Sequence, residues 1–236
     1  MVEPARIKTR VTGLDERLEG GIPGGYLVLV AGPPGSLKSS FAYRILYYEA
    51  LERGAKGLYV SLEQSRESLE RQAESLGLQP EKADALRILD LRQLRRELRE
   101  SQGPRDWFAG LGTQLARYKQ ETGIELLAID SLNALYALTN VQEPRRELFD
   151  FFEDLRGLEA TTFLIGETPR DGSFGPFHVV EFLADGIVHL NMKEVEVGLT
   201  RSVRRYIALV KLRGVKHDLD YHPLLVDKDQ FEIVGE

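Results

Sequence analysis

The sequence contains no cysteine among its 236 residues. Disulfide bonds, thiolate zinc sites, iron–sulfur clusters and cysteine nucleophiles are therefore excluded. Long apolar runs are also missing, because stretches such as 26–32 and 125–130 are far too short to cross a bilayer, and no apolar signal region follows Met1. We therefore expect a cytoplasmic protein that has no membrane partner.

Histidine is scarce as well, and the chain has no net positive charge. Histidine occurs only at His178, His189, His217 and His222. Their spacing fits no metal-ligand pattern, so we expect ordinary surface or interface side chains. The formal net charge of −6 argues against binding to nucleic acid through bulk charge, although a local basic groove is compatible with it. The mixed-charge run at 91–101 predicts a solvated helix face, with a nucleic-acid or partner surface as the alternative.

The remaining sequence alternates short apolar runs with longer segments of helical period. The runs lie at 26–32, 57–63, 86–90, 125–130, 161–167 and 186–192, and the helical segments lie near 39–53, 65–76, 105–121 and 144–159. This alternation predicts an α/β fold with a mainly parallel central sheet flanked by helices. After residue 186, a strand, a polar turn and a second strand predict a C-terminal antiparallel hairpin at the sheet edge. No linker interrupts the pattern, so we expect a single domain over residues 1–236.

Residues 32–40, GPPGSLKSS, nearly match the phosphate-binding pattern G-x-x-x-x-G-K-[ST], the Walker A motif. They stand between an apolar run and a helical segment, where backbone N–H groups and a helix N-terminus can hold an anion. A glycine-rich turn with an incidental lysine is the alternative reading. We expect the nucleotide to contact Gly32, Pro33, Pro34, Gly35, Ser36, Leu37, Lys38, Ser39 and Ser40.

Individual roles within this loop follow from its chemistry. Lys38 is expected to neutralise the β- and γ-phosphates of ATP, and the Ser39 hydroxyl to ligate Mg²⁺. The motif's second glycine is replaced by Leu37. Since this position lies at the helix start, we expect a negative φ that leucine can adopt.

Two carboxylates end apolar runs that should lie beside the loop. Asp130 ends the run ELLAID, a position from which it can reach Mg²⁺. Glu63 follows YVSL, at the carboxyl edge where open α/β folds bind ligands, and can activate a water molecule. A strand-end cap is the alternative role for Asp130, and a helix-start glutamate is the alternative for Glu63.

Several ordered motifs make the chain resemble the KaiC-domain group of RecA-like P-loop ATPases, which also includes archaeal RadA-like paralogues. The motifs are the opening TGLDERLEGGIPGGYLVLVAGPPGSLKSS, the catalytic-glutamate strand YVSLEQSRESL, the Walker B strand AIDSLNALY, the late strand VVEFLADGIVHL and the terminal element ALVKLRGVKHD. The resemblance covers nearly the whole chain and implies a RecA-like fold.

The resemblance also implies a homo-oligomeric ring, usually a hexamer, with ATP bound between subunits. Lys211 and Arg213 would then act on the γ-phosphate in the neighbouring subunit, as an arginine finger does. His217 would lie in the same interface. The alternative is that residues 206–214 form an edge strand whose polar side chains face water.

Two departures from the family pattern imply slow hydrolysis. Leu37 replaces a loop glycine, and Gln64 stands where many relatives carry a second glutamate. Self-phosphorylation is not expected, because Glu181 and Phe182 occupy the place of the Ser-Thr pair in the self-phosphorylating KaiC domain, although Thr168 and Ser173 are hydroxyls nearby.

The function implied is therefore a Mg²⁺-dependent ATPase in a regulatory or signalling role. The first alternative is a DNA recombination or repair accessory ATPase, which would bind single-stranded DNA; the acidic composition disfavours it. The second is a nucleotide-sensing scaffold that hardly hydrolyses ATP, and Leu37 and Gln64 keep this alternative open.

Overall fold

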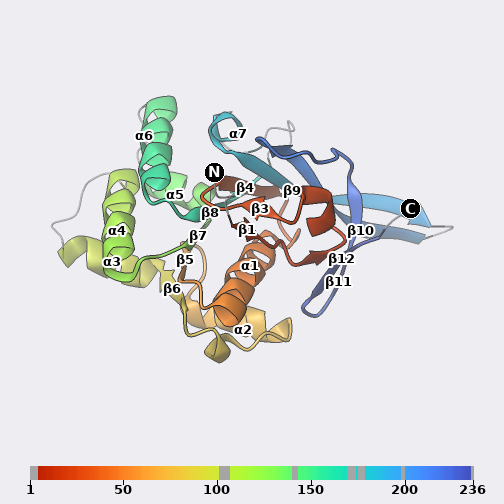
Figure 1. Ribbon diagram of the computed structural model, residues 1–236, viewed down its shortest axis with the longest axis horizontal. Coiled ribbons are helices and arrows are strands. Elements are labelled where there is room, and N and C mark those ends of the chain that lie inside the picture. The colour runs from red at the N-terminus through yellow and green to blue at the C-terminus, as the bar shows by residue number, and fades with distance from the viewer. Residues whose placement is uncertain are drawn as a thin grey trace.

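The computed structural model describes residues 5–100, 107–139, 143–168, 174, 179–197 and 200–234. A twisted sheet crosses the molecule with helices on both of its faces (Figure 1). Its strand order is β2-β12-β11-β10-β9-β4-β8-β7-β5-β6. The strands are β2 (Val11–Thr12), β4 (Leu27–Gly32), β5 (Gly57–Ser61), β6 (Leu86–Asp90), β7 (Leu126–Asp130), β8 (Thr161–Glu167), β9 (Gly186–Val197), β10 (Thr200–Leu212), β11 (His222–Asp227) and β12 (Gln230–Ile233).

The smaller elements surround this sheet. The helices are α1 (Lys38–Arg53), α2 (Arg66–Ser75), α3 (Leu91–Glu100), α4 (Trp107–Thr122), α5 (Leu132–Leu138), α6 (Pro144–Gly157) and α7 (Val180–Leu183). Two 3₁₀ turns, at Asp15–Leu18 and Pro80–Lys82, and a separate pair of short strands, β1 (Arg6–Ile7) and β3 (Ile22–Pro23), complete the fold.

The neighbouring strands β9, β4, β8, β7, β5 and β6 run parallel to one another, and this part of the sheet is buried on both faces. Helices α1 and α2 pack on one face with Phe41, Ile45 and Leu69. Helices α4, α5 and α6 pack on the other with Phe108 and Phe151 among their buried residues. Burial on both faces explains why these strands are continuous apolar runs without alternation.

The predicted fold class is confirmed, including the six strands that form β4 to β9 and the antiparallel hairpin of β9 and β10. The sheet continues beyond this hairpin, because β11 and β12 form a second one and β2 pairs with β12. Residues 91–100 form α3, and its exposed Arg92, Arg95 and Arg96 confirm the predicted solvated helix face. Its Glu97 accepts hydrogen bonds from Gln114 and Tyr118 of α4, which covers that part of α3. In the described part of the chain, no helix combines the length and apolar character that a membrane span requires.

Candidate functional site

The predicted phosphate loop connects the end of β4 to the start of α1, in the middle of the parallel strands. A side chain at Gly32 would place its Cβ 2.0 Å from the carbonyl oxygen of Leu190 on β9. Gly35 has φ of +81°, a left-handed conformation that favours glycine. Both glycines are therefore required by the path of the loop.

Leu37 adopts a backbone conformation that the sequence analysis did not expect. Its φ is +73° and its ψ is 26°, so the prediction of a negative φ is wrong. The turn into α1 requires a left-handed residue here, the conformation that the motif's usual glycine adopts readily. A residue with a Cβ pays about 1–2 kcal/mol for this conformation. The half-buried leucine side chain packs against the hydrophobic core on the α1 side of the sheet, and this packing offsets part of that cost.

Lys38 begins α1 and points its ammonium group back across the loop. Its Nζ donates a hydrogen bond to the carbonyl oxygen of Pro33 at 3.0 Å. Burial lowers the pKa of Lys38, while the negative charges of Glu167, Asp130 and Glu63 act in the opposite direction. The lysine is thus set among acidic groups that come from different strands.

Asp130 is buried at the end of β7 and is held by Tyr59 of β5. The Tyr59 hydroxyl donates to Asp130 Oδ2 at 2.6 Å. Burial raises the pKa of Asp130, and hydrogen bonds from Tyr59 and Ser39 lower it. Ser39 and Asp130, the two predicted magnesium ligands, therefore lie together.

Glu63 lies two residues beyond the end of β5 and is exposed. Its Oε1 accepts a hydrogen bond from the Ser131 hydroxyl, and Ser131 also caps the N-terminus of α5. Gln64 turns toward α2, where its amide bonds to the side chains of Ser68 and Gln72. Glu63 alone of this pair therefore faces the β7 end of the site.

The other loop residues differ in how their polar groups are satisfied. The Ser40 hydroxyl is buried and accepts a hydrogen bond from Gln72 at 3.1 Å. The Ser36 hydroxyl is buried too, but it has no partner among the residues that the structure describes. Pro33 and Pro34 lie in the turn between Gly32 and Gly35, and Pro33 supplies the carbonyl that holds Lys38.

The structure adds two residues to this site that the sequence analysis missed. Glu167 ends β8 directly opposite Gly32 in the strand register, and its N–H donates to Asn133 of α5. An apolar strand that ends in a carboxylate is the same signal that identified Asp130, so Glu167 could have been found. Arg205 of β10 donates from Nε to the Gly35 carbonyl oxygen at 3.5 Å, and no motif in the sequence marks it.

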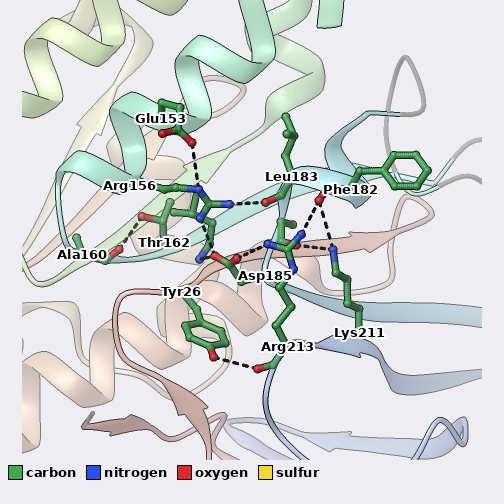
Figure 2. A network of polar contacts seen from close by, with 12 residues as sticks. Tyr26, Glu153, Arg156, Ala160, Thr162, Phe182, Leu183, Asp185, Lys211 and Arg213 are labelled. Carbon is green, nitrogen blue, oxygen red and sulfur yellow. Dashed lines mark hydrogen bonds and ion pairs between the residues drawn. The ribbon is translucent and has the colours of Figure 1, made fainter. Parts of the chain in front are cut away.

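The predicted finger residues, Lys211 and Arg213, have their partners elsewhere in the chain (Figure 2). Lys211 Nζ donates to the carbonyl oxygens of Glu181 at 2.9 Å and Ala184 at 2.7 Å. Arg213 donates to the Phe182 carbonyl oxygen and forms an ion pair with Asp185. Both cations thus hold the end of α7, and in the described part of the chain neither is hydrogen-bonded to residues 32–40.

The histidines occupy different environments. His217 Nδ1 lies 2.9 Å from the Val215 carbonyl oxygen, and its buried Nε2 has no partner among the described residues. His189 is buried, which corrects the expectation of a surface or interface side chain. Burial lowers the pKa of His189 to about 4. His222 contacts Asp218, and His178 lies outside the described residues, as does most of the segment 168–177 with Ser173.

Comparisons with known proteins show the family and the fold to which the chain is similar. The family model described as "ATPase: KaiC" matches residues 7–236. The chain is 30% identical to a UPF0273 protein of Thermotoga maritima, over 94% of this chain and 93% of that protein. It is also 30% identical to the circadian clock oscillator protein KaiC of a Picosynechococcus strain, of which it covers 44%. A crystal structure of a KaiC-like protein from Pyrococcus horikoshii superposes with a TM-score of 0.80 at 26% identity, covering 98% of this chain and 100% of that one.

Proposed function

Because this chain belongs to the KaiC family of P-loop ATPases, we propose that it is a slow, Mg²⁺-dependent ATP hydrolase with a regulatory or signalling role. Residues 1–236 would form one RecA-like domain. Copies of the chain would assemble in the cytoplasm as a homo-oligomeric ring, a hexamer, with an active site between neighbouring subunits. Autokinase activity is not part of the proposal.

The observation that carries the proposal is the meeting of three predicted groups at the carboxyl edge of the sheet. Lys38 comes from the loop after β4, Asp130 ends β7 and Glu63 follows β5, and the two carboxylates act electrostatically on the lysine. These strands are neighbours or near neighbours in the sheet, so residues remote in sequence share one site. A cation beside backbone N–H groups binds phosphate. Of the two carboxylates, Asp130 would ligate Mg²⁺ and Glu63 would activate water.

The oxygen groups at this edge suit Mg²⁺. The ion prefers carboxylate and hydroxyl oxygens and is commonly held by one or two protein carboxylates together with phosphates and water. Asp130 and Ser39 are such donors and lie in contact. No group of three or more His, Cys, Asp or Glu side chains that could hold a metal ion occurs in the described ranges, so the ion would take its other ligands from the nucleotide and water. When bound, Mg²⁺ would neutralise negative charge on the phosphates.

The nucleotide would be held by the loop. Lys38 would exchange its Pro33 contact for phosphate oxygens, and the unpartnered Ser36 hydroxyl is a further donor within the loop. Glu63 would orient the attacking water and accept its proton. Lys211 and Arg213 would stabilise the phosphate charge in the neighbouring subunit, beside His217.

The test is steady-state phosphate release with Mg·ATP, comparing the wild-type protein with Glu63→Gln. Nucleotide binding is measured in both proteins with a fluorescent ATP analogue. We expect the wild type to turn over and the variant to bind equally well without turnover. If the variant hydrolyses ATP at the wild-type rate, Glu63 does not activate water and this assignment of the site fails.

A second function, nucleotide sensing with little hydrolysis, is favoured by one observation. Leu37 holds the loop in a conformation that is strained for a residue with a side chain. A loop under such strain can retain binding while it positions the γ-phosphate poorly. Light scattering with ATP and with ADP separates the two functions, since a sensor changes its assembly state with the nucleotide while releasing no phosphate.

A further inference from the structure

The charged network around the predicted finger is centred on Asp185, which follows α7. Figure 2 shows Asp185 between Arg156 of α6 and Arg213, with Lys211 beside Arg213. Its Oδ1 accepts from Arg213 Nη1 at 3.0 Å, and its Oδ2 accepts from Arg156 Nη1 at 2.9 Å. One carboxylate therefore bridges two guanidinium groups from different elements.

The backbone of Asp185 makes a second set of connections. Its N–H donates to the Leu27 carbonyl oxygen at 2.8 Å, and its carbonyl oxygen accepts from the Arg213 N–H at 2.9 Å. The Leu27 N–H in turn donates to Asp185 Oδ2 at 3.1 Å. Leu27 begins β4, the strand that ends in the phosphate loop. Asp185 is thus hydrogen-bonded both to Leu27, the first residue of β4, and to Arg213, the residue predicted to act on another subunit.

The negative charge of Asp185 offsets the positive charges of the three basic side chains around it. Arg156, Lys211 and Arg213 gather positive charge around the end of α7. Burial lowers the pKa of Lys211 and the charges of Arg213 and Arg156 lower it further, while Asp185 opposes them. The Asp185 side chain is only 14% exposed, so its charge is weakly screened. Without it, repulsion would drive the Arg213 side chain away from Arg156 and Lys211.

Arg213 is anchored but still accessible. Its Nη1 and Nη2 donate to Asp185 and to the Phe182 carbonyl oxygen, while the side chain remains 51% exposed. A guanidinium has five N–H donors, so two anchoring contacts leave donors for a ligand. The Tyr26 hydroxyl fixes the other end of the residue by donating to the Arg213 carbonyl oxygen at 2.9 Å.

We propose that Asp185 is a positioning residue, which fixes the Arg213 guanidinium in the orientation required at the nucleotide of the neighbouring subunit. The inference rests on the proposed function, because it takes Arg213 to act in that neighbour. It goes further by assigning a role to a carboxylate whose side chain is hydrogen-bonded to Leu27, Arg156 and Arg213. Misplacing a transition-state group by about 1 Å costs about 100-fold in rate.

Mixed assemblies test this role because they separate the subunit that supplies the finger from the one that supplies the loop. Glu63→Gln subunits keep Arg213, and Arg213→Ala subunits keep Glu63. Mixing them should restore phosphate release at sites that combine the two intact halves. Asp185→Asn is then introduced into one subunit type at a time. The asparagine oxygen can still accept from the Leu27 N–H, whereas its NH₂ group cannot pair with a guanidinium.

The two placements should give different results. In the Glu63→Gln subunits, Asp185→Asn should reduce the restored rate by about 10- to 100-fold, because those subunits supply Arg213. In the Arg213→Ala subunits it should change the rate by less than about twofold, because the residue that it positions is already gone. Equal loss in both placements, including loss through misfolding, would overturn the positioning role. So would no loss in either placement.

A matched control and a further outcome complete the design. Glu52→Gln removes the same charge from a bidentate pair with Arg10, at the far end of α1 from the loop, and should leave the restored rate unchanged in both placements. If the parent mixture without Asp185→Asn restores nothing, Arg213 does not act in trans, and the composite site falls together with this inference. Restoration in the parent mixture that Asp185→Asn leaves intact removes the inference alone.

Discussion

The phosphate loop and the end of β10 carry the two halves of the proposed site, and they differ in how their polar groups are satisfied. At the loop, the buried Ser36 hydroxyl has no partner among the described residues, and the Lys38 ammonium group donates a hydrogen bond to the Pro33 carbonyl oxygen. At the end of β10, Lys211 and Arg213 both donate to α7, and Arg213 pairs with Asp185. The first half therefore contains a buried hydroxyl without a described partner, while the charged groups of the second are anchored to α7 and Asp185 of the same chain.

The difference indicates what each half must do. A group that binds its ligand directly benefits from donors that folding leaves unsatisfied, since these gain most from the ligand. A group that must reach another subunit benefits from anchoring, because a long arginine side chain otherwise loses conformational entropy on binding. Substitutions in the two halves should therefore affect nucleotide binding and turnover differently.

Arg213→Ala should give the largest effect on catalysis. Removing an arginine finger costs about 10³-fold or more in turnover, because charge on the transferred phosphoryl group is left unstabilised. Nucleotide affinity should change by less than about tenfold if the loop supplies most of the binding. Single-turnover phosphate release and fluorescent-nucleotide titration measure the two quantities separately. Wild-type turnover in the variant would show that Arg213 has no catalytic part.

Lys38→Ala should weaken nucleotide binding by about 100-fold, because it removes a charge-assisted contact to phosphate at a half-buried position. The same titration measures this change, with Lys82→Ala as a control that removes an exposed lysine from a 3₁₀ turn. Unchanged affinity in Lys38→Ala would mean that the loop does not bind phosphate. The contrast with Arg213→Ala, where turnover falls and binding persists, would then disappear.

Tyr59→Phe should affect the loop half alone. The substitution deletes the hydroxyl that donates to Asp130 at 2.6 Å inside the core. Loss of a buried hydrogen bond to a charged group costs about 1–3 kcal/mol, measured by denaturant unfolding. The affinity for Mg²⁺ in the presence of nucleotide should fall by about tenfold, because Asp130 loses its orientation. A loss of stability with unchanged Mg²⁺ affinity would make Tyr59 a core residue only.

Leu37 offers the smallest and most specific test. Leu37→Gly and Leu37→Ala remove the same packing against the α1 core, but only glycine relieves the left-handed strain at φ of +73°. The free energy of unfolding of the glycine variant, measured in urea, should therefore be about 1 kcal/mol higher than that of the alanine variant. Equal stability of the two variants would show that this position is unstrained. Comparing their turnover then shows whether the strain slows hydrolysis.

The strand ends that carry the loop half of the proposed site could be predicted because their signals are local. GPPGSLKSS, Asp130 and Glu63 each lie at the end of an apolar run, and parallel strands bring such ends together. The same reasoning could have found Glu167. The φ of Leu37 could not be predicted from the residue type, since leucine prefers negative φ and the conformation is imposed by the join of β4 to α1.

The sequence alone predicted the strands from β4 to β9 along the chain and the strand-end positions of residues 32–40, Asp130 and Glu63, because apolar periodicity and glycine placement act over a few residues. The contacts of Asp185 with Leu27, Arg156 and Arg213, and of Arg205 with the loop, are seen only in the folded structure. These contacts connect segments remote in sequence, and they form because folding brings the buried start of β4, the end of α7 and the end of β10 to one place. A polar group enclosed there is stable only when partners from those segments surround it.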